Sequence, residues 1–306
     1  MTKVLFKIYM AFTVCAFIIF LICGMDFTGA VNHALSTVSA GGFSTYNESA
    51  AYFDDVYVEG WMTFFMVLAG GNFGLYYRAY HKGAAVLLKD TEFKAYLSIL
   101  VVAAIIIIGD LMVELDSDFF TALRYAAFQT ASIATTGFVS ADYDRWPVLS
   151  KFVLMGLMIC GGCAGSTAAG LKISRVVILF RSVKSTVLHL LYPKHVVEVM
   201  MNGTTLHDST VLRVGQYFFM YIFFILFFAL LLAFDGVGGF DALGISVSTM
   251  GCIGPAFGVT GATCTYADLS WFSKTVICFS MLLGRLEIFT ILVMLRPGLW
   301  KGKNTW

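Results

Sequence analysis

Residues 36–45 read STVSAGGFST, a small and polar stretch beside a long apolar run. The stretch belongs to a repeat. Three ten-residue segments align without gaps: ALSTVSAGGF at 34–43, QTASIATTGF at 129–138 and SVSTMGCIGP at 246–255. Each segment lies between two apolar runs and carries a glycine at the same place, namely Gly42, Gly137 and Gly254. The chain therefore contains an internal repeat with a period of about one hundred residues.

The composition is typical of a polytopic membrane protein. Of the 306 residues, 59% are hydrophobic and 13% are charged, whereas a soluble domain is about half apolar and about a quarter charged. A membrane helix needs about 20 mostly apolar residues. Runs of this kind lie at 4–24, 59–80, 95–115, 147–181, 210–234 and 269–296. We therefore expect an all-α fold with six membrane spans, the fourth of which is interrupted.

The charged residues divide between the two sides of this arrangement. If both termini are cytoplasmic, only four of the 20 Lys and Arg residues fall outside: Arg124, Arg145, Lys151 and Lys274. Cytoplasmic loops of membrane proteins carry an excess of Lys and Arg, so we expect both termini in the cytoplasm. Most of the 19 acidic residues fall on the outer side, where a negative surface concentrates cations. The net charge of only +1 argues against a nucleic-acid partner.

Each repeat has the order helix, short re-entrant segment, helix. Irregular backbone at membrane depth is tolerated only where it is buried in protein or lines a water-filled cavity. A short helix before each glycine, such as 121–133, would point its partly negative C-terminus at the membrane centre. The glycine then lets the chain turn its carbonyls inward. Rings of carbonyl oxygens form potassium filters, so three aligned copies favour an ion-selectivity filter, although any one glycine alone fits a turn or close helix packing.

The predicted filter residues come from all three copies. The first copy supplies Ser39, Ala40, Gly41 and Gly42, the second Ala134, Thr135, Thr136 and Gly137, and the third Cys252, Ile253 and Gly254. Their carbonyls are the expected ion ligands. The hydroxyls of Ser39, Thr135 and Thr136 would add further oxygens.

The fourth predicted span contains CGGCAGSTAAG at 160–170. Four glycines within one span cannot make a firm helix. The stretch therefore predicts either tight helix packing through small residues or an intramembrane loop that blocks the path below the filter. The candidate gate residues are Gly161, Gly162, Ala164, Gly165, Ser166, Thr167 and Gly170.

Arg285 is a second gate candidate, because it lies inside the last predicted span. A charged residue within a span marks a functional site by default. The alternative is that its side chain snorkels to the inner surface. Glu287 is two residues further on and points to a different helix face, so it is no obvious intrahelical partner. Asn72, in the second predicted span, is interpreted as a group that hydrogen-bonds between helices rather than an ion ligand.

Six stretches carry a family resemblance. They are LSTVSAGGFST, GGNFGLYYRA, TASIATTGFVSADYDRWP, GGCAGSTAAGLKISR, STMGCIGPAFG and MLLGRLEIFT. In this order they resemble pore loops and following helices of the Trk/Ktr/HKT superfamily of potassium transporters, most closely the bacterial TrkH-type membrane subunit. The resemblance covers nearly the whole chain. It implies potassium uptake across the cytoplasmic (inner) membrane, a gate at 161–170, and an arginine at position 285 that faces the ion path.

The chain departs from this family in the number of units. Family members carry four helix–pore loop–helix units, whereas this chain carries three, at 1–80, 81–195 and 196–306, which resemble the second to fourth. We therefore expect a pore that is incomplete alone: a fragment, a split subunit that needs a complementing first unit, or the product of a decayed gene. The alternatives are a non-conducting relative that acts in assembly or regulation, and a sodium-permeable cation transporter.

The resemblance also implies partners. Family members of this type work as dimers and with a cytosolic ring that binds nucleotides, in addition to membrane lipid. The basic segments 81–94 and 172–195 are candidate docking surfaces for that ring, or ordinary positive-inside loops. We expect K+ as the transported ion and no covalently bound cofactor. The sequence contains no HExxH, nucleophile elbow, P-loop or histidine cluster, so we do not expect an enzyme.

Overall fold

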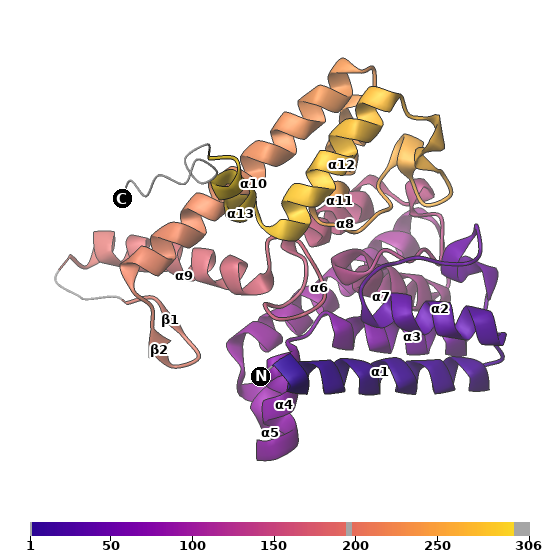
Figure 1. Ribbon diagram of the computed structural model, residues 1–306, viewed down its shortest axis with the longest axis horizontal. Helices are drawn as coiled ribbons and strands as arrows, with labels where there is room; N and C mark the ends of the chain where they lie inside the picture. Colours follow the sequence, from indigo (N-terminus) through magenta and orange to yellow (C-terminus); the bar gives the residue numbers. More distant parts are fainter. Residues whose placement is uncertain (1, 194–197, 297–306) are drawn as a thin grey trace.

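The structure is a computed structural model that describes residues 2–193 and 198–296. Nearly all of its regular structure is helical (Figure 1), which confirms the expected all-α fold. Among the described residues, the strands are β1 (Met200–Met201) and β2 (Thr204–Thr205), which pair antiparallel in a small hairpin. Three bases assigned to the inner side, Lys194, Lys301 and Lys303, lie outside the described residues.

The helices fall into three successive groups. The first contains α1 (Thr2–Ile22), α2 (Phe27–Val38), α3 (Val56–Ala69) and α4 (Phe73–Lys82). After α5 (Ala85–Lys89), the second contains α6 (Thr91–Glu114), α7 (Phe119–Thr135), α8 (Val148–Cys160) and α9 (Ile173–Leu191). The third contains α10 (Asp208–Phe234), α11 (Gly239–Met250), α12 (Trp271–Leu286) and α13 (Ile288–Met294). Short 3-10 helices lie at Ser49–Tyr52, Tyr143–Arg145, Gly258–Thr260 and Tyr266–Asp268.

Each group repeats one arrangement: a long helix, a short buried helix (α2, α7 or α11) and a second long helix made of two pieces, α3 and α4, α8 and α9, or α12 and α13. Within a group the long helices pack on the short one, as α1 and α3 pack on α2, α6 and α8 on α7, and α10 and α12 on α11. Between groups, the second long helix packs on the next short helix, α3 on α7 and α8 on α11. Figure 1 shows the second group between the other two.

The second long helix of every group is broken. The predicted interruption within 147–181 is present as a loop at 161–172. The predicted continuous spans at 59–80 and 269–296 were wrong, since α3 and α4 are separate helices and α12 meets α13 at a bend of 107°. Among the described residues, three helices are long and apolar enough to cross a membrane (Lys3–Ile22, Thr91–Glu114 and Asp208–Phe234), or four if the bent pair counts as one span.

The break between α3 and α4 has a local cause. Gly70 and Gly71 are poor helix formers, and Asn72 then starts a new helix as its N-cap. The Asn72 side-chain oxygen accepts hydrogen bonds from the backbone N–H groups of Gly74, at 2.8 Å, and Leu75, at 3.2 Å. Side-chain oxygens at this position satisfy backbone donors that an isolated helix start leaves free. Asn72, which was predicted to hydrogen-bond between helices, therefore caps α4, the helix that it begins.

The interior is polar along the short helices and mostly apolar elsewhere, apart from buried groups such as Glu59 and Glu92. Two apolar clusters form the core, one around α1, α2 and α3 and the other around α6 to α12. Hydroxyl groups lie buried along the short helices between them, at Ser36, Thr37, Thr130, Ser132, Thr135, Ser246, Ser248 and Thr249. Buried polar groups need hydrogen-bond partners, and most of these hydroxyls bond a backbone carbonyl, as Thr37 bonds that of His33 at 2.6 Å. The short helices therefore form a polar centre inside an apolar shell.

Candidate ion pathway

The short helix α2 ends in a tight left-handed turn at the first predicted filter segment. The N–H of Gly41 donates to the carbonyl of Ser36 at 2.8 Å, and the N–H of Ala40 to that of Thr37 at 3.2 Å. Ala40 has a positive φ of 56°. These two bonds with a left-handed residue make a Schellman C-cap. The chain therefore leaves the helix sharply at Ser39.

The third predicted filter segment repeats this turn. The N–H of Ile253 donates to the carbonyl of Ser248 at 3.0 Å, that of Cys252 donates to Thr249 at 3.1 Å, and Cys252 has a φ of 51°. Left-handed torsions are costly for residues other than glycine. The same cost at Ala40 and Cys252 shows that the two copies share one backbone path.

The middle segment differs, because α7 continues through Thr135 before it turns. The N–H groups of Thr136 and Gly137 both donate to the carbonyl of Ser132, at 2.7 and 2.9 Å. The left-handed torsion then falls on Gly137, with a φ of 100°. Positive φ also occurs at Gly42 (70°) and Gly254 (109°). The glycines that align in the sequence thus share the backbone conformation that glycine adopts most readily.

The three segments lie side by side in a fixed order. A Cβ atom on Gly42 would lie 2.5 Å from the carbonyl oxygen of Thr136, and one on Gly137 would meet the carbonyl oxygen of Ile253. Each contacted carbonyl belongs to the residue just before the glycine of the next segment. Around Gly254 no described heavy atom lies within 4 Å of the corresponding position. The segments therefore form an arc with one open side.

The exposure of the segments matches this arc. Residues 134–137 of the middle segment are buried, whereas Gly41, Gly42 and Gly254 are partly exposed. Phe138 follows the middle segment, is 0% exposed and stacks on His33 at a centroid distance of 5.7 Å. Phe43 holds the aligned position after the first segment and is 75% exposed. The middle segment has neighbours on both sides, and each outer segment has one.

Hydroxyl groups fix the backbone that leaves each turn. Ser132 donates to the carbonyl of Phe138 at 2.6 Å, and Ser248 to that of Pro255 at 2.7 Å. The hydroxyl of Tyr266 donates to the carbonyl of Gly254. Burial raises the pKa of Tyr266 to about 12, so this hydroxyl remains a donor at neutral pH. The Gly254 carbonyl is thus held by the protein.

The hydroxyls predicted as extra ion ligands bond to the protein as well. Ser39 donates to the carbonyl of Ser36 at 3.3 Å. Thr135 donates to the carbonyl of Ala131 at 2.9 Å and lies 3.0 Å from the hydroxyl of Thr136. Backbone carbonyls are therefore better placed than these hydroxyls to face an ion.

The 161–172 loop between α8 and α9 is closed at its base. Three backbone hydrogen bonds join its two ends: Leu171 to Ile159 at 3.1 Å, Lys172 to Cys160 at 3.0 Å, and Ile173 to Gly162 at 3.0 Å. Gly161, Gly165 and Gly170 have φ values of 68°, 78° and 87°. Positive φ at three glycines lets the chain form a compact loop where a helix would otherwise continue.

The loop is bound to the break between α3 and α4. The N–H of Cys163 donates to the carbonyl of Gly70 at 2.8 Å, and the N–H of Phe73 donates to the carbonyl of Gly165 at 3.2 Å. Helix breaks leave backbone donors and acceptors without partners inside the helix. The two interruptions satisfy each other's backbone groups, which explains why both occur at the same level.

Thr167 joins the loop to the other groups of helices. Its hydroxyl lies 3.0 Å from the carbonyl oxygen of Val38, the last residue of α2, and 3.2 Å from that of Ala69. Its own carbonyl accepts a hydrogen bond from Arg285 Nη1 at 3.1 Å. Thr167 thus contacts the first group through α2 and α3 and the third through α12, directly beneath the end of a short helix.

Comparison with known proteins gives the family. The TrkH family model, described as a cation transport protein, matches residues 1–303. This chain belongs to the TrkH family. It is 34% identical over 305 residues to the Trk system potassium uptake protein TrkH of Halomonas elongata and 30% identical over 304 residues to that of Escherichia coli K12, and each match covers 98% of this chain.

A solved TrkH structure has the same fold. The crystal structure of the potassium transporter TrkH from Vibrio parahaemolyticus superposes with a TM-score of 0.91 at 30% identity and covers 98% of this chain. This chain covers 64% of that structure and 62% of the length of the curated relatives. The relatives are named as uptake proteins rather than as enzymes. The TrkH-family chain therefore spans less than two thirds of the proteins that it resembles.

A cavity of about 220 Å³ lies below Thr167 in this TrkH-family chain. It is lined by Ser166, Thr167, Ala168, Ala169, Gly170, Lys172, Tyr217, Gly284, Arg285 and Glu287. Of the candidate gate residues, Ser166, Thr167, Gly170 and Arg285 border the cavity, whereas Gly161, Gly162, Ala164 and Gly165 do not line it.

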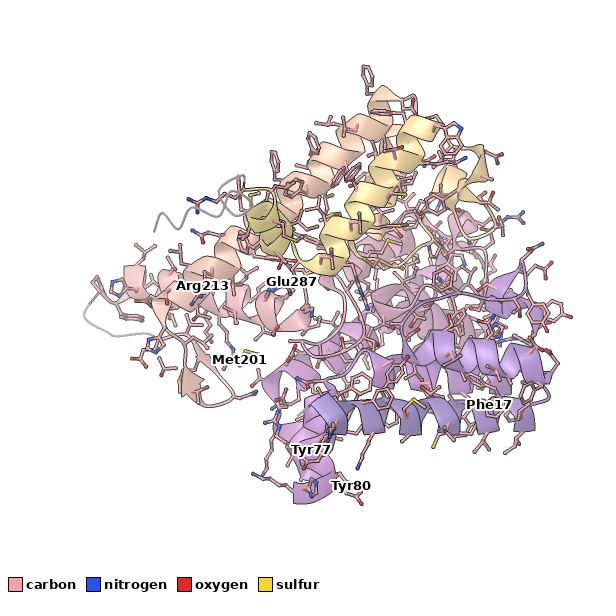
Figure 2. All side chains as sticks on the ribbon, in the orientation of Figure 1. Phe17, Tyr77, Tyr80, Met201, Arg213 and Glu287 are labelled. Carbon is pink, nitrogen blue, oxygen red and sulfur yellow. The ribbon has the colours of Figure 1, made fainter. Side chains whose placement is uncertain are left out.

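The sequence indicated only that Glu287 is no obvious partner of Arg285, and the structure pairs Glu287 with a residue on another helix. Glu287 Oε1 lies 2.9 Å from Arg175 Nη2, and the guanidinium of Arg175 lies 3.9 Å from the ring centroid of Tyr217. Figure 2 labels Glu287 at the junction of α12 and α13. The residue has a φ of 63° and lies at the bend between α12 and α13. Only the fold brings these residues together, since they are far apart in the sequence.

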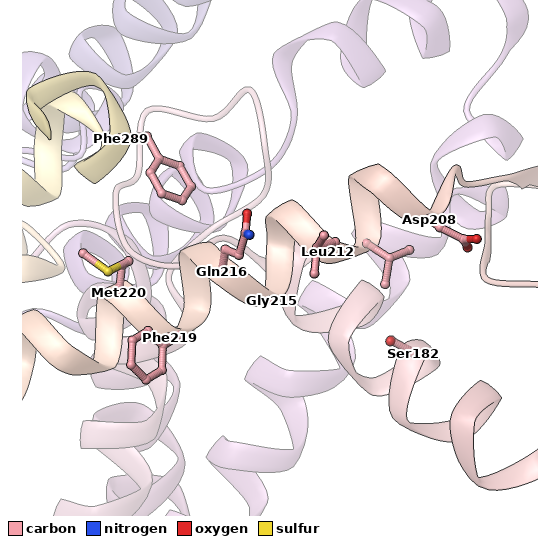
Figure 3. Close-up of a pocket in the computed structure, with 9 residues that line it drawn as sticks. Ser182, Asp208, Leu212, Gly215, Gln216, Phe219, Met220 and Phe289 are labelled. Atoms are coloured by element: carbon pink, nitrogen blue, oxygen red, sulfur yellow. The ribbon is translucent and has the colours of Figure 1, made fainter. Parts of the chain in front are cut away.

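A second cavity, of about 860 Å³, lies apart from the predicted site residues. Figure 3 shows Leu212, Gln216, Phe219 and Met220 of α10 on one side and Phe289 of α13 on the other. Its lining is mostly apolar, and none of the predicted filter or gate residues borders it. The predicted filter and gate residues therefore gather in the arc of three segments and in the 161–172 loop, away from this second cavity.

Proposed function

We propose that this chain forms three of the four walls of a potassium pore and serves K+ uptake across the cytoplasmic membrane. The observation that carries the proposal is the regular approach of Gly42 to Thr136 and of Gly137 to Ile253. A repeated contact of this kind places equivalent backbones around one axis. The names of the relatives, Trk system potassium uptake proteins, support K+ as the ion.

The ion path runs between the three segments. Its ligands are backbone carbonyls of residues 39–42, 134–137 and 252–254, which replace part of the ion's hydration shell. The Gly254 carbonyl would use its second lone pair, because it also accepts a hydrogen bond from Tyr266. The C-termini of α2, α7 and α11 add a partly negative potential at the same point. Each segment belongs to one unit, at 1–80, 81–195 and 196–306. Both termini lie in the cytoplasm, as the distribution of Lys and Arg favours.

The 161–172 loop, which we call the gate loop, is the proposed gate. It comes from the second unit, and Thr167 touches the first unit and receives a hydrogen bond from Arg285 of the third. A positive guanidinium on the path opposes the passage of a cation. Conduction therefore requires the gate loop and Arg285 to move apart, which would break the hydrogen bond between Arg285 and Thr167.

A fourth unit closes the ring in this proposal. It lies between the third unit and the first, where Gly254 has an open side and Phe43 is exposed. By the pattern of the other contacts, its filter carbonyl approaches Gly254 and its short helix covers Phe43. We propose as further partners a second copy of the pore, a cytosolic nucleotide-binding ring at the basic segments 81–94 and 172–195, and the surrounding lipid.

The test is complementation between two pieces. The chain is expressed with and without a separate first unit from a full-length relative, in a bacterium that lacks potassium uptake. We expect growth at low potassium only when both pieces are present. Absence of growth when both pieces are found in the membrane would contradict the proposal.

The open arc also favours a second candidate, a relative that conducts nothing by itself and acts in assembly or regulation. Ion flux separates the two candidates. Vesicles that contain both pieces should take up Rb+, a potassium analogue, in preference to Na+. Equal uptake of Na+ would indicate a sodium-permeable transporter, and co-purification with a full-length relative without any gain in flux would favour the assembly role.

A further inference from the structure

The small hairpin between α9 and α10 is attached to the start of α6. Asn202, in the turn between β1 and β2, accepts a hydrogen bond from the backbone N–H of Thr91 at 2.8 Å. Its amide nitrogen donates to Asp90 Oδ2 at 2.9 Å. Figures 1 and 2 show this hairpin, with Met201 labelled, projecting from the helices toward that end of the molecule. One exposed side chain thus binds two consecutive residues of another unit.

Asp90 connects this contact to the helix itself. Its other carboxylate oxygen accepts from the N–H of Phe93 at 3.0 Å and caps α6, and Arg78 lies 3.7 Å from the oxygen that Asn202 binds. A cap determines where and in which direction a helix begins. The hairpin therefore holds the position of the first turn of α6.

The same first turn reaches the gate loop. The Glu92 side chain is 6% exposed, and its carboxylate accepts a hydrogen bond from the backbone N–H of Ala164. Ser174, just beyond the other end of the loop, faces the same carboxylate. A buried carboxylate is costly unless it is hydrogen-bonded. Loss of the contacts between Glu92 and the loop would therefore be destabilising.

We infer that Glu92 is a positioning residue for the gate loop and that the β1–β2 hairpin acts on the loop through it. The inference rests on the proposed role of the loop as the gate. The connection runs from Asn202 to Asp90 and Thr91, then through one turn of helix to Glu92 and Ala164. Ala164 is three residues from Thr167, which touches all three units. A displacement of the hairpin would thereby be transmitted to the gate loop on the proposed ion path.

Hydrogen–deuterium exchange of the purified chain in lipid nanodiscs tests the connection without any need for transport. Loss of a hydrogen bond to a charged group should speed exchange of the amides at 163–167 by about tenfold to a hundredfold. We expect this increase in Glu92→Ala and a smaller one in Asn202→Ala. Glu92→Gln keeps an acceptor oxygen and should stay close to the wild type.

The matched control is Thr205→Ala, which removes a hydrogen bond from Thr205 to Glu198 within the same hairpin. This variant should leave exchange at 163–167 unchanged. If Asn202→Ala speeds exchange only in the hairpin and at the start of α6, the coupling is overturned. If Glu92→Ala has no effect at 163–167 in a folded sample, the positioning role is overturned. Should Glu92→Ala not fold, the exposed Asn202 still tests the connection.

Transport separates the inference from the proposed function. In the two-piece complementation system, Asn202→Ala should change the rate of Rb+ uptake at equal expression, whereas Thr205→Ala should not. If the wild type takes up no Rb+ but the exchange pattern holds, the proposed function fails and the connection from the hairpin to the loop stands.

Discussion

Gly137 and Gly254 share a left-handed torsion but differ in what lies beside them. The backbone at Gly137 is pressed against the carbonyl of Ile253, whereas the corresponding side of Gly254 is open. Gly137 is therefore required by both torsion and space, and Gly254 in this chain by torsion alone. This pair separates the two reasons for a glycine within one protein.

Alanine at the two positions should have unequal costs. A left-handed alanine costs about 1–2 kcal/mol, and forcing atoms into a packed site costs about 1–3 kcal/mol more. Gly137→Ala should therefore destabilise the chain by about 2–5 kcal/mol and Gly254→Ala by about 1–2 kcal/mol. The midpoint of thermal unfolding in detergent measures the difference.

The complementing first unit provides the control for this pair. When it occupies the open side of Gly254, Gly254→Ala should become as harmful as Gly137→Ala. Equal destabilisation of the chain alone would show that the middle segment is not packed against its neighbour as described.

Helix ends in this chain are set by side chains that hydropathy does not register. The stretch 160–170 was predictable as an interruption because four glycines stand together. The breaks at Asn72 and Glu287 were missed, since both lie in apolar runs long enough to span a membrane. Asn72 acts by capping, and Glu287 through Arg175, a partner distant in the sequence. The cluster of glycines was recognised in the sequence, whereas the local cap at Asn72 and the pairing of Glu287 across helices were not.

One contact between helix ends gives a dependence on pH. Asp235, the C-cap of α10, accepts hydrogen bonds from Ser270 and, at 2.6 Å, from Ser273 at the start of α12. These bonds lower the pKa of Asp235 from its ordinary value of 3.8. A lowered pKa in the folded state stabilises the fold above the unfolded value, and this contribution is lost as the pH falls through the folded value.

Asp235→Asn should therefore lower the midpoint of thermal unfolding at pH 7, and the gap from the wild type should close as the pH falls below the ordinary pKa of 3.8 and through the lowered folded-state pKa. Thermal melts across this range measure the gap. Asp268→Asn, in the loop that leads to α12, controls for the change in net charge. A gap that stays constant down to the lowest pH would contradict the assigned role of the carboxylate.

The whole molecule is an arc whose two ends differ from its middle. Phe138 is enclosed because the first unit covers it, and the aligned Phe43 is exposed because no described unit stands on its far side. Three repeats that each pack on the next leave one free edge at either end. The exposed Phe43 at one end and the open side of Gly254 at the other distinguish this arc from a closed ring.

Labelling with a maleimide should report this difference. In a background without the exposed cysteines Cys15, Cys264 and Cys278, Phe43→Cys should react readily and Phe138→Cys slowly. Mass spectrometry measures the extent of labelling. Co-expression with the first unit should protect Phe43→Cys. Continued reactivity when both pieces co-purify would place the first unit elsewhere.

The sequence revealed local patterns better than contacts between segments. The aligned glycines and the 160–170 stretch were found because each is a local pattern. Glu92 was missed because it resembles any acidic residue in the first turn of a helix, and its partner Ala164 lies in another segment of the chain. The hydroxyls of Ser39 and Thr135 were assigned to the ion, whereas they bond to helix carbonyls. The hydrogen-bond partners of these side chains can be assigned only when their neighbours in three dimensions are known.

Each glycine contacts a carbonyl of the segment that follows it in the sequence, so these contacts form in a fixed order during synthesis. Chains fold from the N-terminus as they are made, so Gly42 finds its carbonyl only after Thr136 has been inserted. Gly137 must wait in turn for Ile253. Each of the first two segments thus gains its neighbour only after the next unit has been synthesised, whereas the open side of Gly254 gains none from the described residues.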